Sequence, residues 1–215
     1  PVRAALSLEI TVGFDGFYRP RTLTPIAVHI KNDGPQVRGV LHIASDEFLP
    51  DTDRYSYEVT IPRQADQRRF IYFLPTGFAR EIRVDFLSQG RRLARAKYTR
   101  CQEIYDQDRL MAVIGGTGSS FSALSGASIM VPGMPKLRPW DYGALDYYQQ
   151  QMGGGRTAGS IRIAYLSPEV LPDNPECYGS IDILALMATV TENRLSADAQ
   201  RCIPVWVANG GHLII

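Results

Sequence analysis

Leu6-Ser7-Leu8-Glu9-Ile10-Thr11-Val12 alternates apolar and polar side chains over its whole length. Successive side chains of a β-strand point to opposite faces, so this period of two predicts a strand with one buried and one solvated face. Less regular alternation follows at 26–31, 37–43, 55–61, 69–74, 82–87 and 93–98, and most of these stretches are separated by Gly, Pro, Asp or Asn. Short strands with turn signals between them predict an antiparallel, immunoglobulin-like β-sandwich over residues 1–105.

The hydrophobic pattern changes near residue 105. Four stretches are largely apolar at successive positions, so a strand formed by any of them would be apolar on both faces. They are 110–114, 161–166, 181–187 and 212–215. Such strands belong to a parallel sheet that is covered by helices on both faces. We therefore predict a second domain over residues 106–215, a partial three-layer α/β domain.

Two helices are expected beside these strands. Ser196 is a suitable N-cap for a helix over 197–209, which carries an apolar stripe, and Gly210-Gly211 provides its stop. Asp141 would cap a second helix that runs to about Met152.

The composition is that of a globular protein. The 215 residues carry 23 basic and 22 acidic side chains, a net charge of +1. A hydrophobic content of 45% with 21% charged residues excludes wholesale disorder, and the near-neutral net charge excludes a main role in binding nucleic acid or an anionic membrane. No apolar run is long enough to span a membrane, and no signal peptide or anchor is recognisable within these residues.

The cysteines, Cys101, Cys177 and Cys202, are far apart and lack the spacing of a zinc site. Buried thiols are favoured over one disulfide and a spare thiol. Cys202 falls on the apolar stripe of its helix, and His212 is expected to be buried. No nucleophile elbow occurs, so we predict no catalytic residue, no metal site and no cofactor.

A glycine-rich loop, Gly115 to Ser120, follows the first of the doubly apolar runs. Its backbone N–H groups and hydroxyls could bind a small anion, above all if a short helix begins at Ser119 or Ser120. The candidate binding residues are Gly116, Thr117, Gly118, Ser119 and Ser120. The loop lacks the features of a P-loop and of a dinucleotide-binding fold, so a structural turn is favoured over a binding site.

Glu169 and Asp173 follow the run at 161–166. They lie at the carboxyl end of a predicted strand, where open α/β sheets place their ligands. They could bind a ligand or act as acids or bases, although carboxylates in a proline-rich loop are more often solvated or cap helices.

Aromatic side chains are dense in the first half. They are Phe14, Phe17, Tyr18, Tyr55, Tyr57, Phe70, Tyr72 and Phe73. This density favours core or inter-domain packing over a glycan-binding platform, which would need an exposed patch.

The second half also carries a family resemblance, in residues 178–186, 195–200 and 205–214. Their Y-x-x-I-D-x-L-x-L, L-S…Q and W-V-x-x-G-G-x-L-I patterns resemble the class I glutamine amidotransferase-like superfamily, and more narrowly its bacterial envelope members with a leading β-sandwich. The resemblance implies a flavodoxin-like fold over about 109–215, a chain truncated within that domain, and an extracytoplasmic location. The catalytic Cys, His and Glu of active glutaminases have no counterparts in this chain.

We therefore expect a non-enzymatic interaction or scaffold module of a bacterial cell-envelope protein. Its partner would be another protein or a C-terminal region of its own. The alternatives are a small-ligand-binding or hydrolytic α/β domain that uses the loop Gly115–Ser120, and a glycan-binding sandwich.

Overall fold

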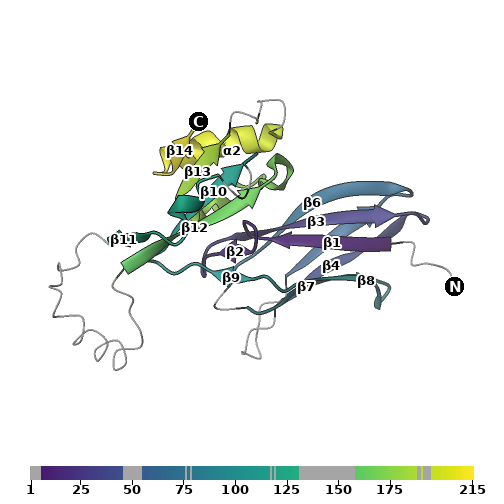
Figure 1. Ribbon diagram of the computed structural model, residues 1–215. Coiled ribbons are helices and arrows are strands. Elements are labelled where there is room, and N and C mark those ends of the chain that lie inside the picture. The colour runs from purple at the N-terminus through teal and green to yellow at the C-terminus, as the bar shows by residue number, and fades with distance from the viewer. Residues whose placement is uncertain are drawn as a thin grey trace, which may run out of the picture.

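The computed structural model describes residues 6–45, 55–75, 77, 79–116, 118, 120–130, 158–187, 190 and 195–215. Most of the regular structure in these residues is β-sheet (Figure 1). The first half forms two antiparallel sheets, one of β1 Leu6–Val12, β3 Thr24–Asn32 and β6 Ala65–Phe73, the other of β5 Ser56–Ile61, β4 Val37–Ser45, β7 Ile82–Ser88 and β8 Arg91–Tyr98. Each strand predicted from alternation in this half is confirmed, and the half is a β-sandwich.

Alternation places one face of each strand in the core between the two sheets. In β1, Leu6 and Leu8 are buried, whereas Ser7 and Glu9 are exposed. The core cluster is mainly aliphatic, with Phe73 and Phe86 as its buried phenylalanines. Burial of this apolar face is the main force that holds the sandwich together.

The second half contains a five-stranded sheet of order β11-β12-β10-β13-β14. Its strands are β10 Arg109–Ile114, β11 Ser128–Met130, β12 Ala158–Leu166, β13 Ile183–Leu186 and β14 His212–Ile214. β10 is parallel to β12 and to β13, and β13 is parallel to β14, while β11 is antiparallel to β12. The parallel pairing predicted from the doubly apolar runs is therefore confirmed.

Helix α2, Ala197–Ala208, begins as predicted. The Oγ atom of its N-cap, Ser196, accepts a hydrogen bond from the backbone N of Ala199 at 3.1 Å. The helix continues through Pro204 and buries the predicted stripe of Ala199, Cys202, Ile203 and Trp206. In the part of the chain that is described, no helix has the length and hydropathy needed to cross a membrane.

The described residues do not show the predicted three-layer, flavodoxin-like domain. The α-helix they contain, α2, packs on one face of the sheet. The crossover from β12 to β13 is made by two short 3-10 helices, η2 Pro168–Val170 and η3 Pro175–Ser180. Prolines recur through this segment, and each removes a backbone N–H that an α-helix would use.

The other helix predictions have different outcomes. The helix from Asp141 to Met152 falls on residues outside the described ranges. In place of a helix from Ser119 or Ser120, the structure has a 3-10 turn, η1 Ser122–Leu124, preceded by Phe121 at a φ of 57°. A left-handed residue at this point is incompatible with a helix that continues from the loop.

A short parallel pair lies where the two halves meet: β2 Phe17–Tyr18 and β9 Gln102–Glu103 (Figure 1). Beside it, Phe14, Phe17 and Ile104 are buried in the same cluster as Trp206 and one face of the second sheet. These three residues precede position 105 in the sequence, yet they pack in the core of the second half. The predicted domain boundary near residue 105 therefore stays a prediction.

Candidate functional site

The glycine-rich loop after β10 has a packing role at Gly116. A Cβ atom on this residue would lie 2.5 Å from Cγ1 of Val113 and 3.3 Å from Oγ of Ser120, so a larger residue would clash. The carbonyl of Ser120 accepts a hydrogen bond from the Tyr165 hydroxyl, which ties the loop to β12. Gly118 has open space around it. Thr117 and Ser119 lie outside the described residues, and anion binding by this loop stays a prediction.

The two candidate carboxylates lie in the crossover after β12. Glu169 is exposed in the first turn of η2. Asp173 accepts a hydrogen bond from the hydroxyl of Tyr72, which belongs to β6 of the sandwich. Partial burial raises the pKa of the Asp173 carboxyl above its usual range. Asp173 thus connects the two halves, and a role in ligand binding or acid–base chemistry stays a prediction.

The thiols are free and mostly buried. Cys177 in η3 and Cys202 in α2 are buried, and Cys101 is half-buried. Burial raises the pKa of Cys177 to about 12 and that of Cys101 to about 11. Because the thiolate is the nucleophilic form, these thiols are poorly suited to attack a substrate at neutral pH.

The histidines are spread over the molecule. His29, His42 and His212 lie on β3, β4 and β14, in three different sheets. His212 is exposed, which corrects the expectation of a buried histidine, because β14 forms a sheet edge and leaves one of its faces open. No cluster of three or more His, Cys, Asp or Glu side chains that could hold a metal ion occurs within the described ranges.

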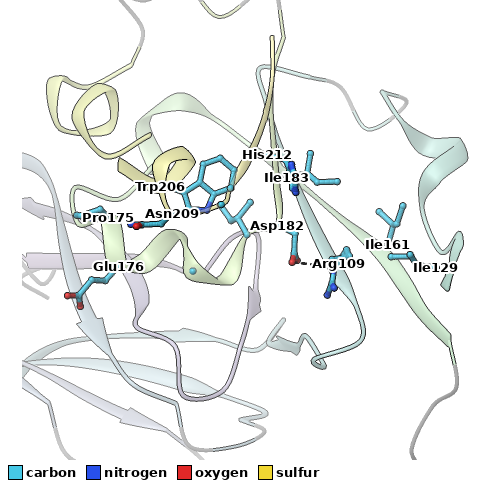
Figure 2. A pocket seen from close by; sticks show the side chains of 14 residues that line it. Arg109, Ile129, Ile161, Pro175, Glu176, Asp182, Ile183, Trp206, Asn209 and His212 are labelled. Carbon is cyan, nitrogen blue, oxygen red and sulfur yellow. Dashed lines mark ion pairs between the residues drawn. The ribbon is translucent and has the colours of Figure 1, made fainter. Parts of the chain in front are cut away.

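Asp182, just before β13, joins three segments of the chain. Its Oδ2 atom accepts hydrogen bonds from Nη2 of Arg19 and from the backbone N of Leu110, each at 2.8 Å. Its Oδ1 atom lies 3.6 Å from Nε of Arg109 (Figure 2). The side chains of Arg19 and Asp182 are only 15% and 24% exposed, so their ion pair is partly shielded from water. A loop of the sandwich is thereby bound to the amino ends of two parallel strands.

Strand β14 forms one edge of the five-stranded sheet. The backbone N of His212 donates to the carbonyl of Asp182 at 3.2 Å, and His212 pairs with Ile183. Along a strand, the backbone N–H and C=O groups of successive residues point to opposite sides. Because those of His212 point toward β13, those of Leu213 point away from β13. Ile214 is 46% exposed. An uncharged edge with outward backbone groups is a template for a further strand.

Comparison with known families concerns the first half of the chain. Residues 5–100 match a family described as a domain of unknown function, DUF8726. No curated protein matches the chain.

Similar solved structures share little sequence with this chain. The CARDB domain of a Pyrococcus furiosus protein, solved with di-metal ions, is 16% identical over 46% of this chain and 87% of that chain, with a TM-score of 0.34. CsgH from R. palustris is 12% identical over 44% of this chain and 92% of that chain, with a TM-score of 0.29. A Paenibacillus glucanotransferase is 14% identical over 97% of this chain and 27% of that chain, with a TM-score of 0.35. Likeness of this degree carries no argument about function.

The resemblance to the glutamine amidotransferase-like superfamily is wrong. The family match is to a domain of unknown function, and the described residues are mainly strands. The residues that suggested the superfamily have ordinary structural roles: Tyr178 fills the core, Asp182 anchors a strand, and Gly211 packs under Trp206. Glycine after a helix and apolar residues along a buried strand are common to many folds, so this pattern does not identify a superfamily.

Sequence reasoning did not single out Arg19 or Asp182 as site residues. One signal for Asp182 was present, since a carboxylate that interrupts an apolar run needs a polar partner when it is buried. Nothing local identified that partner, because Arg19 is separated from Asp182 by 163 positions.

Proposed function

We propose that this chain is a non-enzymatic interaction module of a bacterial cell-envelope protein. The sandwich supports the second sheet, and the edge strand β14 receives an extended, apolar segment, either of a protein partner or of a C-terminal region of its own. The observation that carries the proposal is that β14 is an edge strand among the described residues, with the outward backbone groups of Leu213 next to the exposed side chain of Ile214. Strand addition uses both features, because backbone bonds supply affinity and side-chain contacts supply specificity.

The contacts between the two halves support the scaffold part of the proposal. Phe14 and Phe17 are buried with the second sheet, and the Arg19–Asp182 and Tyr72–Asp173 hydrogen bonds lie at the same boundary. A segment that pairs with β14 is therefore held in a fixed position relative to the sandwich.

The architecture fits this role. The parallel order β12-β10-β13-β14 is the one in which a doubly wound sheet begins, and we propose that arrangement for the second half. Sandwiches of the immunoglobulin type are common in cell-surface domains, which supports the envelope location. Fractionation of cells that express the natural gene tests that location.

Of the alternative functions predicted from the sequence, a glycan-binding sandwich has less support. Of the eight aromatic residues named in the sequence analysis, Phe14, Phe17, Tyr18 and Phe73 are buried, and the other four are half-buried. A glycan platform needs an exposed aromatic surface, which these residues do not form.

Selection of peptides from a random display library against the intact chain tests the edge. We expect extended, apolar sequences whose binding is lost in Leu213→Pro, because proline removes the outward N–H and leaves the bonds to β13 in place. Val205→Lys, at an exposed position on α2, is the matched control and should bind normally. Peptides that bind Leu213→Pro as well as the parent chain would contradict the proposal, and so would self-association through β14 in sedimentation.

A further inference from the structure

The outer face of β7 and β8, at one side of the sandwich, is rich in basic side chains (Figure 1). Val84 of β7 is fully buried, so Arg83 and Asp85 on either side of it point toward solvent. Their partners across the strands, Lys97 and Arg95 of β8, lie on the same face. Strand β8 itself contains no acidic residue.

A β-bulge adds a further basic side chain of β8 to this face. The register shifts between Phe86 and Leu87, and Leu93 is the residue of β8 left without a partner. Arg92 therefore pairs with Leu87 and points to the same side as Arg95. Without the extra residue, Arg92 would point to the opposite side. We call the cations of this surface the basic face: Arg83, Arg92, Arg95 and Lys97.

The carboxylates at the basic face lie deeper than the cations. The side chain of Asp85 is 12% exposed, against 51% for Arg92, and that of Glu81 is 22% exposed, against 51% for Lys97. Nε and Nη2 of Arg95 donate to Asp85 at 2.6 and 2.8 Å, and Nζ of Lys97 lies 3.1 Å from Glu81. The carboxylates thus hold the cations in place, and the positive charge in excess faces the solvent.

The neighbouring strand does not offset this charge. On β4, the residues beside β7 on the same face are Val40, His42 and Ala44, and β4 contains no acidic residue. Glu58 of β5 pairs with Arg38 at 3.1 Å, so these two charges cancel each other. The described part of the face is therefore positive, although the whole chain is nearly neutral.

We infer that the basic face binds an extended, acidic segment of a protein partner. Alternate residues of an extended chain are about 7 Å apart, both on β8 and in such a segment, so carboxylates at every second position meet successive cations. Arginine clusters recognise acidic motifs through charge-assisted hydrogen bonds. Cations that are already held in place lose little conformational freedom on binding. The basic face belongs to the sandwich, so this binding does not depend on β14.

Fluorescence anisotropy with three labelled peptides tests the basic face. Glutamate and serine alternate in the first peptide, glutamine replaces glutamate in the second, and the glutamates form one block in the third. We expect saturable binding of the alternating peptide at low ionic strength and no binding of the glutamine peptide, because salt-sensitive charge attraction drives the association. The block peptide should bind about threefold more weakly, since only every second carboxylate of a block faces the surface.

Charge-matched variants locate the binding surface. Arg92→Gln combined with Lys97→Gln should weaken binding of the alternating peptide about fivefold or more. Arg68→Gln combined with Arg69→Gln, on β6 of the other sheet, removes the same charge and should bind normally. Leu213→Pro should also bind normally, so a failure of strand addition at β14 would leave this result unchanged.

Several outcomes would overturn the inference. They include the absence of saturable binding, binding of the glutamine peptide, and binding that survives the first double variant. Equal binding of the block peptide, a single-stranded oligonucleotide or anionic lipid vesicles would show generic charge attraction in place of recognition. Binding that appears only after replacement of four acidic residues by their amides would assign the face to the chain's own loop. These residues follow β4 outside the described ranges: Asp46, Glu47, Asp51 and Asp53.

Discussion

Asp182 shows how a single carboxylate can hold distant parts of a chain together. Its oxygens accept from the backbone at the start of β10 and from Arg19 of the sandwich. A partly buried carboxylate is costly unless such partners are present, and here they come from two separate segments. The residue therefore links the amino edge of the parallel sheet to the sandwich.

A double-mutant cycle with Arg19→Gln and Asp182→Asn measures this link. We expect a coupling energy of about 1–3 kcal/mol in urea unfolding, because the pair is partly shielded from water. The exposed pair Asp198–Arg201 on α2 is the control, and its coupling should not exceed about 0.5 kcal/mol. A coupling for Arg19 and Asp182 no larger than that of the control would contradict the assignment.

Thiol labelling tests the burial of Cys177. Because burial raises the pKa of this thiol to about 12, from a usual value of 9.0, its thiolate fraction at pH 8 is lower by about a thousandfold. A disulfide reagent should therefore label Cys177 very slowly in the native protein and rapidly in denaturant. Mass spectrometry identifies the labelled site, and rapid native labelling of Cys177 would show that the thiol is accessible.

The end of helix α2 is fixed by two glycines with different roles. Gly210 has a φ of +99°, and a Cβ atom on it would have no heavy atom within 4 Å, so its role is conformational. A Cβ atom on Gly211 would lie 2.2 Å from the Trp206 ring. The path from the helix into β14 therefore depends on close packing under an indole ring.

Alanine at each glycine separates these roles. Gly210→Ala should cost about 1 kcal/mol through backbone strain alone. Gly211→Ala should cost about 1–3 kcal/mol through overpacking, and it should also shift the emission of Trp206 in the Trp140→Phe background. Urea unfolding and fluorescence measure both effects. An unchanged Trp206 spectrum in Gly211→Ala would contradict the packing described.

The pairing of β7 with β8 predicts a pH dependence. Two hydrogen bonds from Arg95, at 2.6 and 2.8 Å, lower the pKa of Asp85 below its usual range. A lowered pKa stabilises the folded state above the unfolded value of about 3.9, and that stability is lost as the pH falls through the folded pKa. Asp85→Asn should therefore be destabilising at pH 7, with a difference that narrows below about pH 3.9. A difference that is constant from pH 7 to pH 2.5 would contradict this origin.

The sequence predicted elements well where the pattern was long and regular. The alternation in β1, the apolar run of β10 and the N-cap of α2 each reflect a local rule that the structure obeys. The two-residue strands β2 and β9 were not predicted, because they are too short to show a period. The contacts of the candidate site were not predicted either, since Arg19 and Asp173 find their partners in the other half of the chain.

The two halves of the molecule share buried surface. Phe14 is fully buried, and its ring centroid lies 6.2 Å from that of Tyr178 in η3. Tyr178 in turn packs against Trp206 of α2, with ring centroids 6.3 Å apart. This chain of aromatic contacts runs from a turn of the sandwich to the helix of the second half, so the halves should fold and unfold together.

Calorimetry of the intact chain tests whether the sandwich and the second sheet unfold as one cooperative unit. We predict one transition whose calorimetric and van't Hoff enthalpies agree. Phe14→Ala should cost about 3–5 kcal/mol and split that transition in two. Phe73→Ala, inside the sandwich core, is the control. It should lower the melting temperature without a comparable loss of contact between the halves. Two resolved transitions in the unmodified chain would contradict a rigid body of sandwich and sheet.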